Sequence, residues 1–289
     1  MTELRRVRRL LAFLIATAAL MGVMVAPAGA VTNGDLDGTA HPYVGLMVAQ
    51  DIDGDPLWRC SGTLLSPTLF LTAGHCTEAP AAHVEIFFEP GPAPLATGYP
   101  VAGEHPCAGI VTYGYPCVGD VGGTPYTHPQ YDPDAFFLYD LGVVVLDEPF
   151  VMDTYGALPT LNQLDALQPS SHTTFTSVGY GLQKAFPDAA ASKDEALRIR
   201  MVSYPHLLQI NTGFTGDFSL LLSNNAHTGG TCFGDSGGPN FLGDSNVVAA
   251  VTSFGINPTC AGTGGVYRVD REDDLNWLYG TFGDHLPQP

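Results

Sequence analysis

Apolar residues gather in short runs along the chain, and these runs are rich in β-branched and aromatic side chains. Clusters of Gly, Pro, Asp and Asn separate one run from the next, which is typical of turns between strands. Many short strands predict an all-β fold, as a sandwich or as barrels. The expected strands are Tyr43–Ala49, Thr63–Thr72, His83–Phe88, Leu141–Leu146, Thr173–Val178, Val247–Phe254 and Gly265–Val269.

The C-terminal segment has a different pattern. Residues 270–273 are mostly acidic, and Leu275, Leu278 and Tyr279 follow at helical spacing. Acids in a first turn stabilise the positive end of the helix dipole, so we expect one short C-terminal helix. Two stretches rich in turn-forming or polar residues are expected to be long surface loops: Glu89–Pro125 and Gln183–Asp194.

The first thirty residues have the pattern of an export signal. A basic stretch precedes an apolar run at Leu10–Val25, and the small-residue pattern Ala28-Gly29-Ala30 follows. A membrane anchor is the alternative, but the apolar run is short for a span of about 20 residues. We therefore expect a secreted, extracellular protein that leaves the membrane when residues 1–30 are removed. The basic stretch holds Arg5, Arg6, Arg8 and Arg9.

The chain is strongly acidic, with 11 Lys and Arg against 29 Asp and Glu and a net charge of −18. Residues 1–30 hold four of the arginines and one glutamate, so the chain without them would carry −21. Such a surface repels nucleic acids and anionic membranes, which excludes both as expected partners.

All six cysteines lie beyond the expected signal. An even number in an exported chain predicts disulfides, but six cysteines allow 15 pairings and their spacing does not choose among them. Metal binding is the competing interpretation, and the sequence has neither a C-x-x-C pair nor EF-hand spacing. We therefore expect no metal and no cofactor. The cysteines are Cys60, Cys76, Cys107, Cys117, Cys232 and Cys260.

The segment Gly234–Pro239, with the sequence GDSGGP, carries the sharpest chemical signal. A serine hydroxyl is a weak nucleophile until a base takes its proton, and its attack needs donors for the oxyanion that forms. Flanking glycines let the backbone turn so that consecutive N–H groups point into one pocket. An ordinary Gly-rich turn with a surface serine is the alternative that this segment leaves open by itself.

Two further segments favour the catalytic interpretation. Thr72–Cys76 places His75 at the end of an apolar strand, and Tyr139–Leu146 places Asp140 at the start of another. A lone histidine is more often structural than catalytic. A half-buried carboxylate requires a partner, however, and His75 is the obvious one for Asp140.

Together, Thr72–Cys76, Asp140–Leu146 and Gly234–Pro239 resemble the three signature segments of the chymotrypsin/trypsin family, in that family's order. The resemblance extends from about residue 31 to the terminal helix. It implies two six-stranded antiparallel β-barrels of the chymotrypsin type and a short C-terminal helix. The peptidase domain would span 31–289, with one barrel at about 31–155 and the other, with the helix, at about 156–289.

The resemblance also implies a role for each residue. Ser236 would attack the scissile carbonyl, His75 would take the proton and return it, and Asp140 would orient the imidazole. The N–H groups of Gly234 and Ser236 would form the oxyanion hole. We thus expect a serine endopeptidase that acts as a monomer on protein or peptide substrates through an acyl-enzyme.

The family's disulfides imply a pairing for the cysteines. Cys60 and Cys76 resemble the bridge beneath the catalytic histidine. Cys232 and Cys260 resemble the bridge beside the substrate pocket. Cys107 and Cys117 would then pair with each other, in a bridge without a family counterpart.

By the same resemblance, the specificity pocket is expected to be open and uncharged. The residue six before the serine lies at the base of this pocket, and here it is Gly230 instead of the aspartate of trypsin-like enzymes. Ser253-Phe254-Gly255 and Gly265 resemble the pocket walls, although the register of Gly264 and Gly265 could differ by one. This favours a large apolar or aromatic residue before the cleaved bond, with a broad preference as the alternative.

Members of this family commonly become active when a new N-terminus pairs with the acid before the serine, here Asp235. Cleavage after Ala30 would expose Val31–Gly34, which resembles the family's Ile-Val-Gly-Gly start. We hypothesise that signal removal itself creates the active N-terminus, and the alternative is another partner for Asp235. The Arg-rich signal and the lack of a propeptide favour a bacterial source.

Two other classes of function stay open. A non-catalytic binding protein on the same fold would usually lack one of the three residues, and none is missing here. An esterase of the α/β-hydrolase type also carries G-x-S-x-G, but its histidine follows the serine. Here His75 and Asp140 precede Ser236, and His285 is the only histidine after it.

Overall fold

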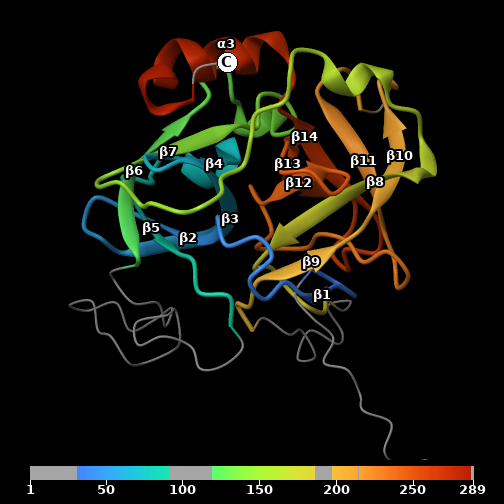
Figure 1. Ribbon diagram of the computed structural model, residues 1–289, viewed down its shortest axis with the longest axis horizontal. Coiled ribbons are helices and arrows are strands. Elements are labelled where there is room, and N and C mark those ends of the chain that lie inside the picture. Colours follow the sequence, from blue (N-terminus) through green and yellow to red (C-terminus); the bar gives the residue numbers. More distant parts are fainter. Residues whose placement is uncertain (1–30, 92–118, 186–196, 214, 288–289) are drawn as a thin grey trace, which may run out of the picture.

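The computed structural model describes residues 31–91, 119–185, 197–213 and 215–287. Within these ranges the chain forms two antiparallel β-barrels, with helix α3 (Glu272–Phe282) along one edge (Figure 1). The predicted fold class is confirmed. The expected signal at residues 1–30 and the expected Cys107–Cys117 pair lie outside the described residues.

The first barrel closes through the strand order β2-β3-β4-β7-β6-β5. Gly45 of β2 pairs with Gly62 of β3, and the ring of Phe70 fills the space that a side chain on Gly62 would need. The two glycines therefore let aromatic side chains pack directly on the strand backbone. The strands are β2 (Val44–Gln50), β3 (Pro56–Ser66), β4 (Leu69–Thr72), β5 (His83–Phe87), β6 (Val121–Thr127) and β7 (Gly142–Leu146).

The second sheet has the order β1-β9-β8-β10-β11-β14-β13-β12, and an additional β8–β12 pairing closes its larger part into a barrel. The short β1 pairs with β9, so the segment that follows residue 31 lies against the second barrel. The division of the chain near residue 155 stays a prediction. The strands are β1 (Asp35–Leu36), β8 (Ser170–Gly179), β9 (Met201–Ser203), β10 (His206–Ile210), β11 (Ser219–Asn224), β12 (Pro239–Leu242), β13 (Val248–Gly255) and β14 (Gly262–Arg268).

One expected strand is a hairpin. The run Thr63–Thr72 divides into β3, which ends at Ser66, and β4, which begins at Leu69. Pro67 lies between them, and its fixed φ suits a turn. The hydroxyl of Ser66 accepts a hydrogen bond from the N–H of Thr68, which closes the turn. The apolar run is continuous in the sequence because both strands are buried.

The loop expected at Glu89–Pro125 extends too far, because β6 begins at Val121. Pro125 is tolerated in β6 since the pairing with β5 ends at Gly123, so no β5 carbonyl there requires an N–H donor. The strands β9 to β12 were not predicted either. In β11 every residue is buried, and a strand covered on both faces shows no alternation. Of the expected loop at Gln183–Asp194, residues 186–194 lie outside the described part.

The predicted C-terminal helix is present as α3. Three acids occupy its first turn, and Asp274, Leu275, Leu278 and Phe282 are buried against the barrels. A short 3-10 turn, η4 (Gly283–His285), continues it. In the described ranges, none of the helices combines the length and the apolar character needed to cross a membrane.

Replacing Gly62 by alanine tests the packing of glycine against aromatic rings. The new Cβ would lie 2.3 Å from the Phe70 ring and 2.5 Å from the carbonyl oxygen of Leu71. We expect the free energy of unfolding to fall by about 1–3 kcal/mol, as for other overpacked sites. Gly280→Ala is the matched control, because its Cβ meets nothing within 4 Å and alanine favours a helix interior by about 0.5–1 kcal/mol. Denaturant unfolding of both variants gives the comparison, and equal stabilities would contradict the prediction.

Candidate active site

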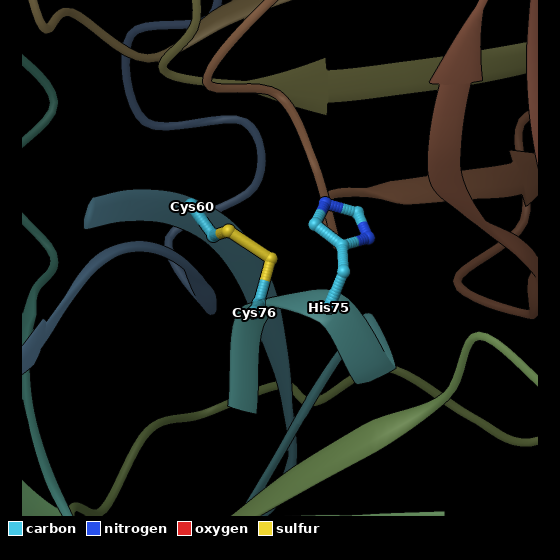
Figure 2. A group of neighbouring side chains, drawn as sticks. All are labelled: Cys60, His75 and Cys76. Carbon is cyan, nitrogen blue, oxygen red and sulfur yellow. A yellow bond between two sulfur atoms is a disulfide. The ribbon is translucent and has the colours of Figure 1, made fainter. Parts of the chain in front are cut away.

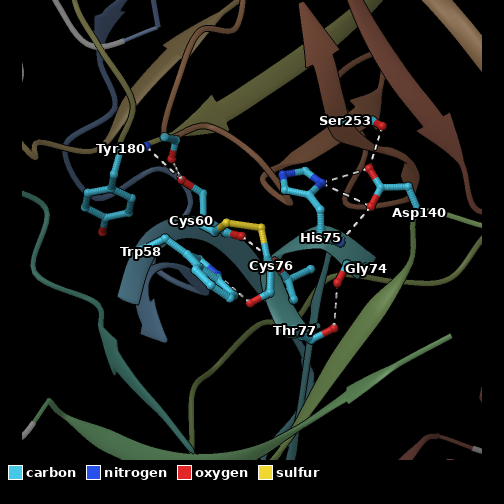
Figure 3. The surroundings of a disulfide bond; sticks show 12 residues. Trp58, Cys60, Gly74, His75, Cys76, Thr77, Asp140, Tyr180 and Ser253 are labelled. Carbon is cyan, nitrogen blue, oxygen red and sulfur yellow. Dashed lines mark hydrogen bonds and ion pairs between the residues drawn. A yellow bond between two sulfur atoms is a disulfide. The ribbon is translucent and has the colours of Figure 1, made fainter. Parts of the chain in front are cut away.

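His75 lies on α2 (Gly74–Thr77), the short helix that follows β4. The disulfide Cys60–Cys76 ties this helix to β3, and the indole N–H of Trp58 donates to the carbonyl oxygen of Cys76 at 3.0 Å (Figures 2 and 3). A side chain on Gly74 would be tightly packed, because its Cβ would lie 3.1 Å from the backbone nitrogen of Leu141 and from the ring of Tyr131. The histidine is therefore fixed by covalent and close-packed neighbours.

Cys60, His75 and Cys76 are a group whose donor atoms lie close enough to hold a metal ion. The two sulfur atoms are joined to each other, as Figure 2 shows. Metal coordination by cysteine requires thiolates, and a disulfide provides none. The donor set therefore does not fit a metal while this disulfide is present.

Asp140 is completely buried at the start of β7 and accepts hydrogen bonds from both barrels. From the first barrel, the N–H of His75 donates to Oδ1 at 2.9 Å, and Nδ1 of His75 lies 3.0 Å from Oδ2. From the second barrel, the hydroxyl of Ser253 donates to Oδ2 at 2.5 Å (Figure 3). A carboxylate in this position fixes the proton of His75 on Nδ1 and leaves Nε2 as an acceptor.

The electrostatic environment of His75 favours its protonated form. Burial by itself would lower the pKa of His75, but the charge of Asp140 and the hydrogen bond to it outweigh burial, and Glu78 adds to them. The pKa of His75 is therefore raised above its ordinary value of 6.5. A base with this pKa accepts a proton readily near neutral pH.

Ser236 lies in a turn that both barrels hold in place. Its carbonyl oxygen accepts a hydrogen bond of 2.7 Å from the N–H of Ser61 in β3. The next N–H, of Gly237, donates to the carbonyl oxygen of Thr252 in β13 at 2.7 Å. A side chain on Gly237 would collide with Thr72, and its φ of +75° also favours glycine. Close approach and backbone conformation thus both require glycine at position 237.

Two backbone donors beside Ser236 are unused. Among the hydrogen bonds of the described residues, neither the N–H of Gly234 nor that of Ser236 is a donor. Gly234 has a φ of +93°, which glycine adopts without strain. Its carbonyl oxygen faces away from the turn and accepts from the hydroxyl of Ser61 at 3.0 Å. Two free N–H groups next to a nucleophile have the form expected of an oxyanion hole.

His75 and Ser236 line one cavity of about 310 Å³. No hydrogen bond joins the Ser236 hydroxyl to His75 among the described residues, and such bonds often form only with substrate. The aromatic side chains on the cavity wall are Phe136, Phe233 and Phe254. The cavity therefore places both candidate groups beside an apolar surface.

The expected pocket residues are only partly brought together. Phe254 and Gly255 line the cavity, and Ser253 does so while its hydroxyl is bound to Asp140. Gly230 is not part of the lining, because it packs against the side chain of Asn224 and donates its N–H to Thr32.

Gly264 and Gly265 have different neighbours on β13. Gly265 pairs with Phe254, and the Phe254 ring fills the space that a side chain on Gly265 would need. Gly264 pairs with Gly255 and lies next to Thr231. Neither glycine is among the described residues that line the cavity, so the assignment of Gly265 to the pocket wall stays a prediction.

Asp235, next to the serine, is completely buried. It accepts hydrogen bonds from the N–H groups of Gly181 at 2.7 Å and Cys232 at 2.8 Å. Burial raises the pKa of Asp235 to about 7, although these two donors and the charge of Arg59 lower it. Within the described residues, no cationic side chain forms a salt bridge with it. Val31 is also buried, against Ile199 and Met201.

The disulfides implied by the family resemblance are both present in the described part of the chain. Cys60 is joined to Cys76, and Cys232 is joined to Cys260. The second bridge holds the segment that leads to Ser236 against the loop between β13 and β14. Both bridges thus lie within a few residues of the candidate groups.

Sequence reasoning missed two contributions to this site. Ser61 holds the Ser236 turn through its N–H and its hydroxyl, and the hydroxyl also accepts from the N–H of Tyr180. Ser253 was expected to touch substrate but binds Asp140. The only available signal for Ser61 is its place directly after a cysteine of the bridge beneath His75.

The two barrels and this arrangement of histidine, aspartate and serine define a protein of the chymotrypsin-like class. The family model described as Trypsin matches residues 121–273, more than half of the chain. The chain belongs to the trypsin family.

Curated relatives are distant. Brachyurin from Leptuca pugilator is 26% identical over 215 residues, which cover 71% of this chain and 80% of the relative. Trypsin 5G1 from Aedes aegypti is 26% identical over 210 residues, with 72% of this chain and 70% of the relative covered. Ovochymase from Halocynthia roretzi is 25% identical over 77% of this chain, which spans only 13% of that protein. All three are animal proteins and give no support to a bacterial source.

Solved structures confirm the fold. The structure titled HL collagenase has a TM-score of 0.62 at 20% identity and covers 88% of this chain and 99% of its own. Human heparin binding protein has a TM-score of 0.59 at 18% identity, with 90% of this chain and 100% of its own covered.

Asp140→Asn tests what sets the pKa of His75. Without the carboxylate, burial is opposed only by Glu78, so we expect the pKa of His75 to fall below 6.5. NMR titration of the His75 ring protons measures the shift. Glu78→Gln is the control and should lower the pKa less, because Glu78 is the smallest of the causes. An unchanged titration in Asp140→Asn would refute this account of the site.

Proposed function

We propose that this chain is a serine endopeptidase that hydrolyses peptide bonds through an acyl-enzyme. The observation that carries the proposal is the hydrogen-bonded pair His75–Asp140, whose histidine lines one cavity with Ser236. Membership of the trypsin family supports it. A non-catalytic binding protein on the same fold and an esterase are the alternatives.

In this proposal Nε2 of His75 takes the proton of the Ser236 hydroxyl as its oxygen attacks the scissile carbonyl carbon. The N–H groups of Gly234 and Ser236 donate to the oxyanion, an interaction worth about 2.7–4 kcal/mol of barrier for each donor. His75 then gives the proton to the leaving amine. In the second half of the reaction, water attacks the acyl-enzyme with His75 again as the base, and the free Ser236 hydroxyl is restored. Asp140 stabilises the imidazolium through its hydrogen bond to Nδ1.

The cavity supports a preference for large apolar or aromatic residues before the cleaved bond. Its wall carries aromatic rings, and none of the described residues that line it is charged apart from His75. A neighbouring hollow of about 540 Å³ shares Phe136 and Phe254 and adds Phe137 and Ile256. Burial of an apolar substrate side chain against these rings contributes about 25 cal/mol per Å².

The purified chain without residues 1–30 should cleave chromogenic peptides with Phe or Leu before the cleaved bond faster than those with Ala or Arg. The reason is the uncharged, aromatic wall of the cavity. Steady-state kcat/KM for the four peptides measures the preference. A strong preference for Arg would contradict the pocket assignment. It would not affect the assignment of Ser236 as the nucleophile.

Ser236→Ala should reduce kcat by about 10⁶-fold, because no other nucleophile can form the acyl-enzyme. The variant removes one oxygen atom from a half-buried side chain that has no hydrogen bond to His75, so unfolding measurements should match those of the parent chain. Unchanged turnover in Ser236→Ala would refute the proposed function. An ester substrate assayed beside the peptides separates an esterase from an endopeptidase.

We also propose that residues 1–30 direct secretion and that their removal after Ala30 activates the enzyme. The new ammonium of Val31 would pair with Asp235, whose buried carboxylate has N–H donors but no cationic partner within the described residues. Val31 has a φ of 61°, which is costly for a β-branched residue, and cutting after Ala30 removes the atom that defines this angle. Thr32 already pairs with Gly230 in the second barrel.

This activation predicts a loss of activity at alkaline pH. Pairing with a buried carboxylate raises the pKa of an α-ammonium above about 8, so the ammonium is charged below that pH and the ion pair is lost as the pH rises through the raised pKa.

N-terminal sequencing of the secreted protein should give Val-Thr-Asn-Gly. Full activity in a secreted form that begins elsewhere would overturn the proposal.

A further inference from the structure

The residue before Asp140 has an unusual backbone conformation. Tyr139 has a φ of 53°, in the left-handed region that bulky residues rarely adopt. The carbonyl oxygen of Tyr139 accepts a hydrogen bond of 2.7 Å from the N–H of Leu141. This closes a three-residue turn with Asp140 at its centre. The conformation of Tyr139 thus sets the direction in which the Asp140 side chain leaves the backbone.

A conformation of this kind persists only where the surroundings determine it. The ring of Tyr139 stacks on His128 with centroids 5.1 Å apart and planes 8° apart. The ring of Phe218 packs against the same ring, with centroids 5.3 Å apart. The hydroxyl lies 3.4 Å from Oδ2 of Asp273 in the first turn of α3. Aromatic contacts from both barrels, together with the terminal helix, therefore hold this ring.

His128, on which the Tyr139 ring stacks, is itself held by several contacts. The N–H of His128 donates to the carbonyl oxygen of Leu141 at 2.9 Å, and its ring packs edge-on against Trp277 of α3 at 4.9 Å. Burial lowers the pKa of His128 to about 4 despite the nearby Asp273, so the imidazole in this stack is neutral at neutral pH. Nε2 of His128 lies 3.8 Å from Asp274, which accepts from the hydroxyl of Tyr267 at 3.0 Å.

We propose that Tyr139 is a positioning residue for the reaction, which acts through Asp140 on His75. The clamped ring keeps the strained turn in place, and the turn keeps both carboxylate oxygens of Asp140 within hydrogen-bond distance of Nδ1 and the N–H of His75. The role of α3 follows from the same contacts. The helix packs against both barrels, through Phe282 on Tyr126 and through Asp274 with Tyr267, and it also holds a residue adjacent to the His75–Asp140 pair.

The conformation and the ring of Tyr139 can be tested separately. Tyr139→Asn keeps a residue that tolerates the left-handed region but removes the stacked ring. Tyr139→Phe keeps the ring and removes only the long contact of the hydroxyl. Tyr126→Asn is the matched control, because Tyr126 packs on Phe282 of α3 with centroids 5.4 Å apart but is not next to Asp140 in the chain.

The first measurement is independent of turnover. In the Ser236→Ala background, NMR titration of the His75 ring should give a lower pKa in Tyr139→Asn than in the parent, since Asp140 no longer holds its position. Tyr139→Phe should restore the parental value, and Tyr126→Asn should not change it. A parental titration in Tyr139→Asn overturns the proposal, and so does an equal shift in Tyr126→Asn.

The kinetic measurement rests on the proposed function. With Ser236 intact, kcat of Tyr139→Asn should fall about 10- to 100-fold while KM stays within about twofold, because a small misplacement near the reacting groups costs this much. A rise in KM with kcat unchanged would overturn the positioning role. If the parent chain shows no peptidase activity, the proposed function fails, but the titration still decides the role of Tyr139.

Phe218→Leu keeps the test decisive if Tyr139→Asn does not fold. Phe218 packs against the Tyr139 ring with centroids 5.3 Å apart, and leucine preserves most of its volume. The His75 pKa should move in the same direction by a smaller amount. An unchanged titration in a folded Phe218→Leu protein counts against the proposal.

Discussion

The structure depends on satisfying one buried anion. Asp140 has no exposed surface, and a carboxylate in such a place is stable only with donors directed at it. His75 supplies donors from the first barrel and Ser253 supplies one from the second. The two barrels must therefore be docked before Asp140 can be buried as an anion. The same requirement explains why the turn that carries Asp140 is packed so closely by Tyr139 and α3.

The turn that carries Ser236 uses the same principle of joint support. Ser61 of the first barrel and Thr252 of the second bind consecutive parts of its backbone. These bonds occupy the carbonyl oxygen of Ser236 and the N–H of Gly237, and they leave the N–H groups of Gly234 and Ser236 free. Because some backbone groups of this turn are bound to the two barrels, the remaining N–H donors are held in a fixed direction. They need no reorganisation when negative charge develops on the substrate oxygen.

The sequence predicted the parts of this arrangement that depend on residue type and missed those that depend on tertiary contact. The GDSGGP segment was predictable because the close approach to Thr72 and the positive φ values of Gly234 and Gly237 admit only glycine. The hydroxyl of Ser253 could not be assigned to Asp140, since 113 residues separate the two. The sequence left the register of β14 open, because Gly264 and Gly265 are the same residue type and differ only in their partners on β13. Strands buried on both faces, such as β11, gave no alternation to detect.

The two buried carboxylates of the site differ in how completely they are satisfied. Asp140 has its partners in place while Val31 is still joined to Ala30. Asp235 has two backbone donors, and burial raises its pKa to about 7 although Arg59 lies near enough to lower it, as expected of a carboxylate without a salt bridge among the described residues. Activation by a new N-terminus would therefore leave the His75–Asp140 pair unchanged and act on the turn around Asp235. Since Gly234 and Ser236 flank Asp235, the oxyanion donors would be the part of the site that gains most from that charge.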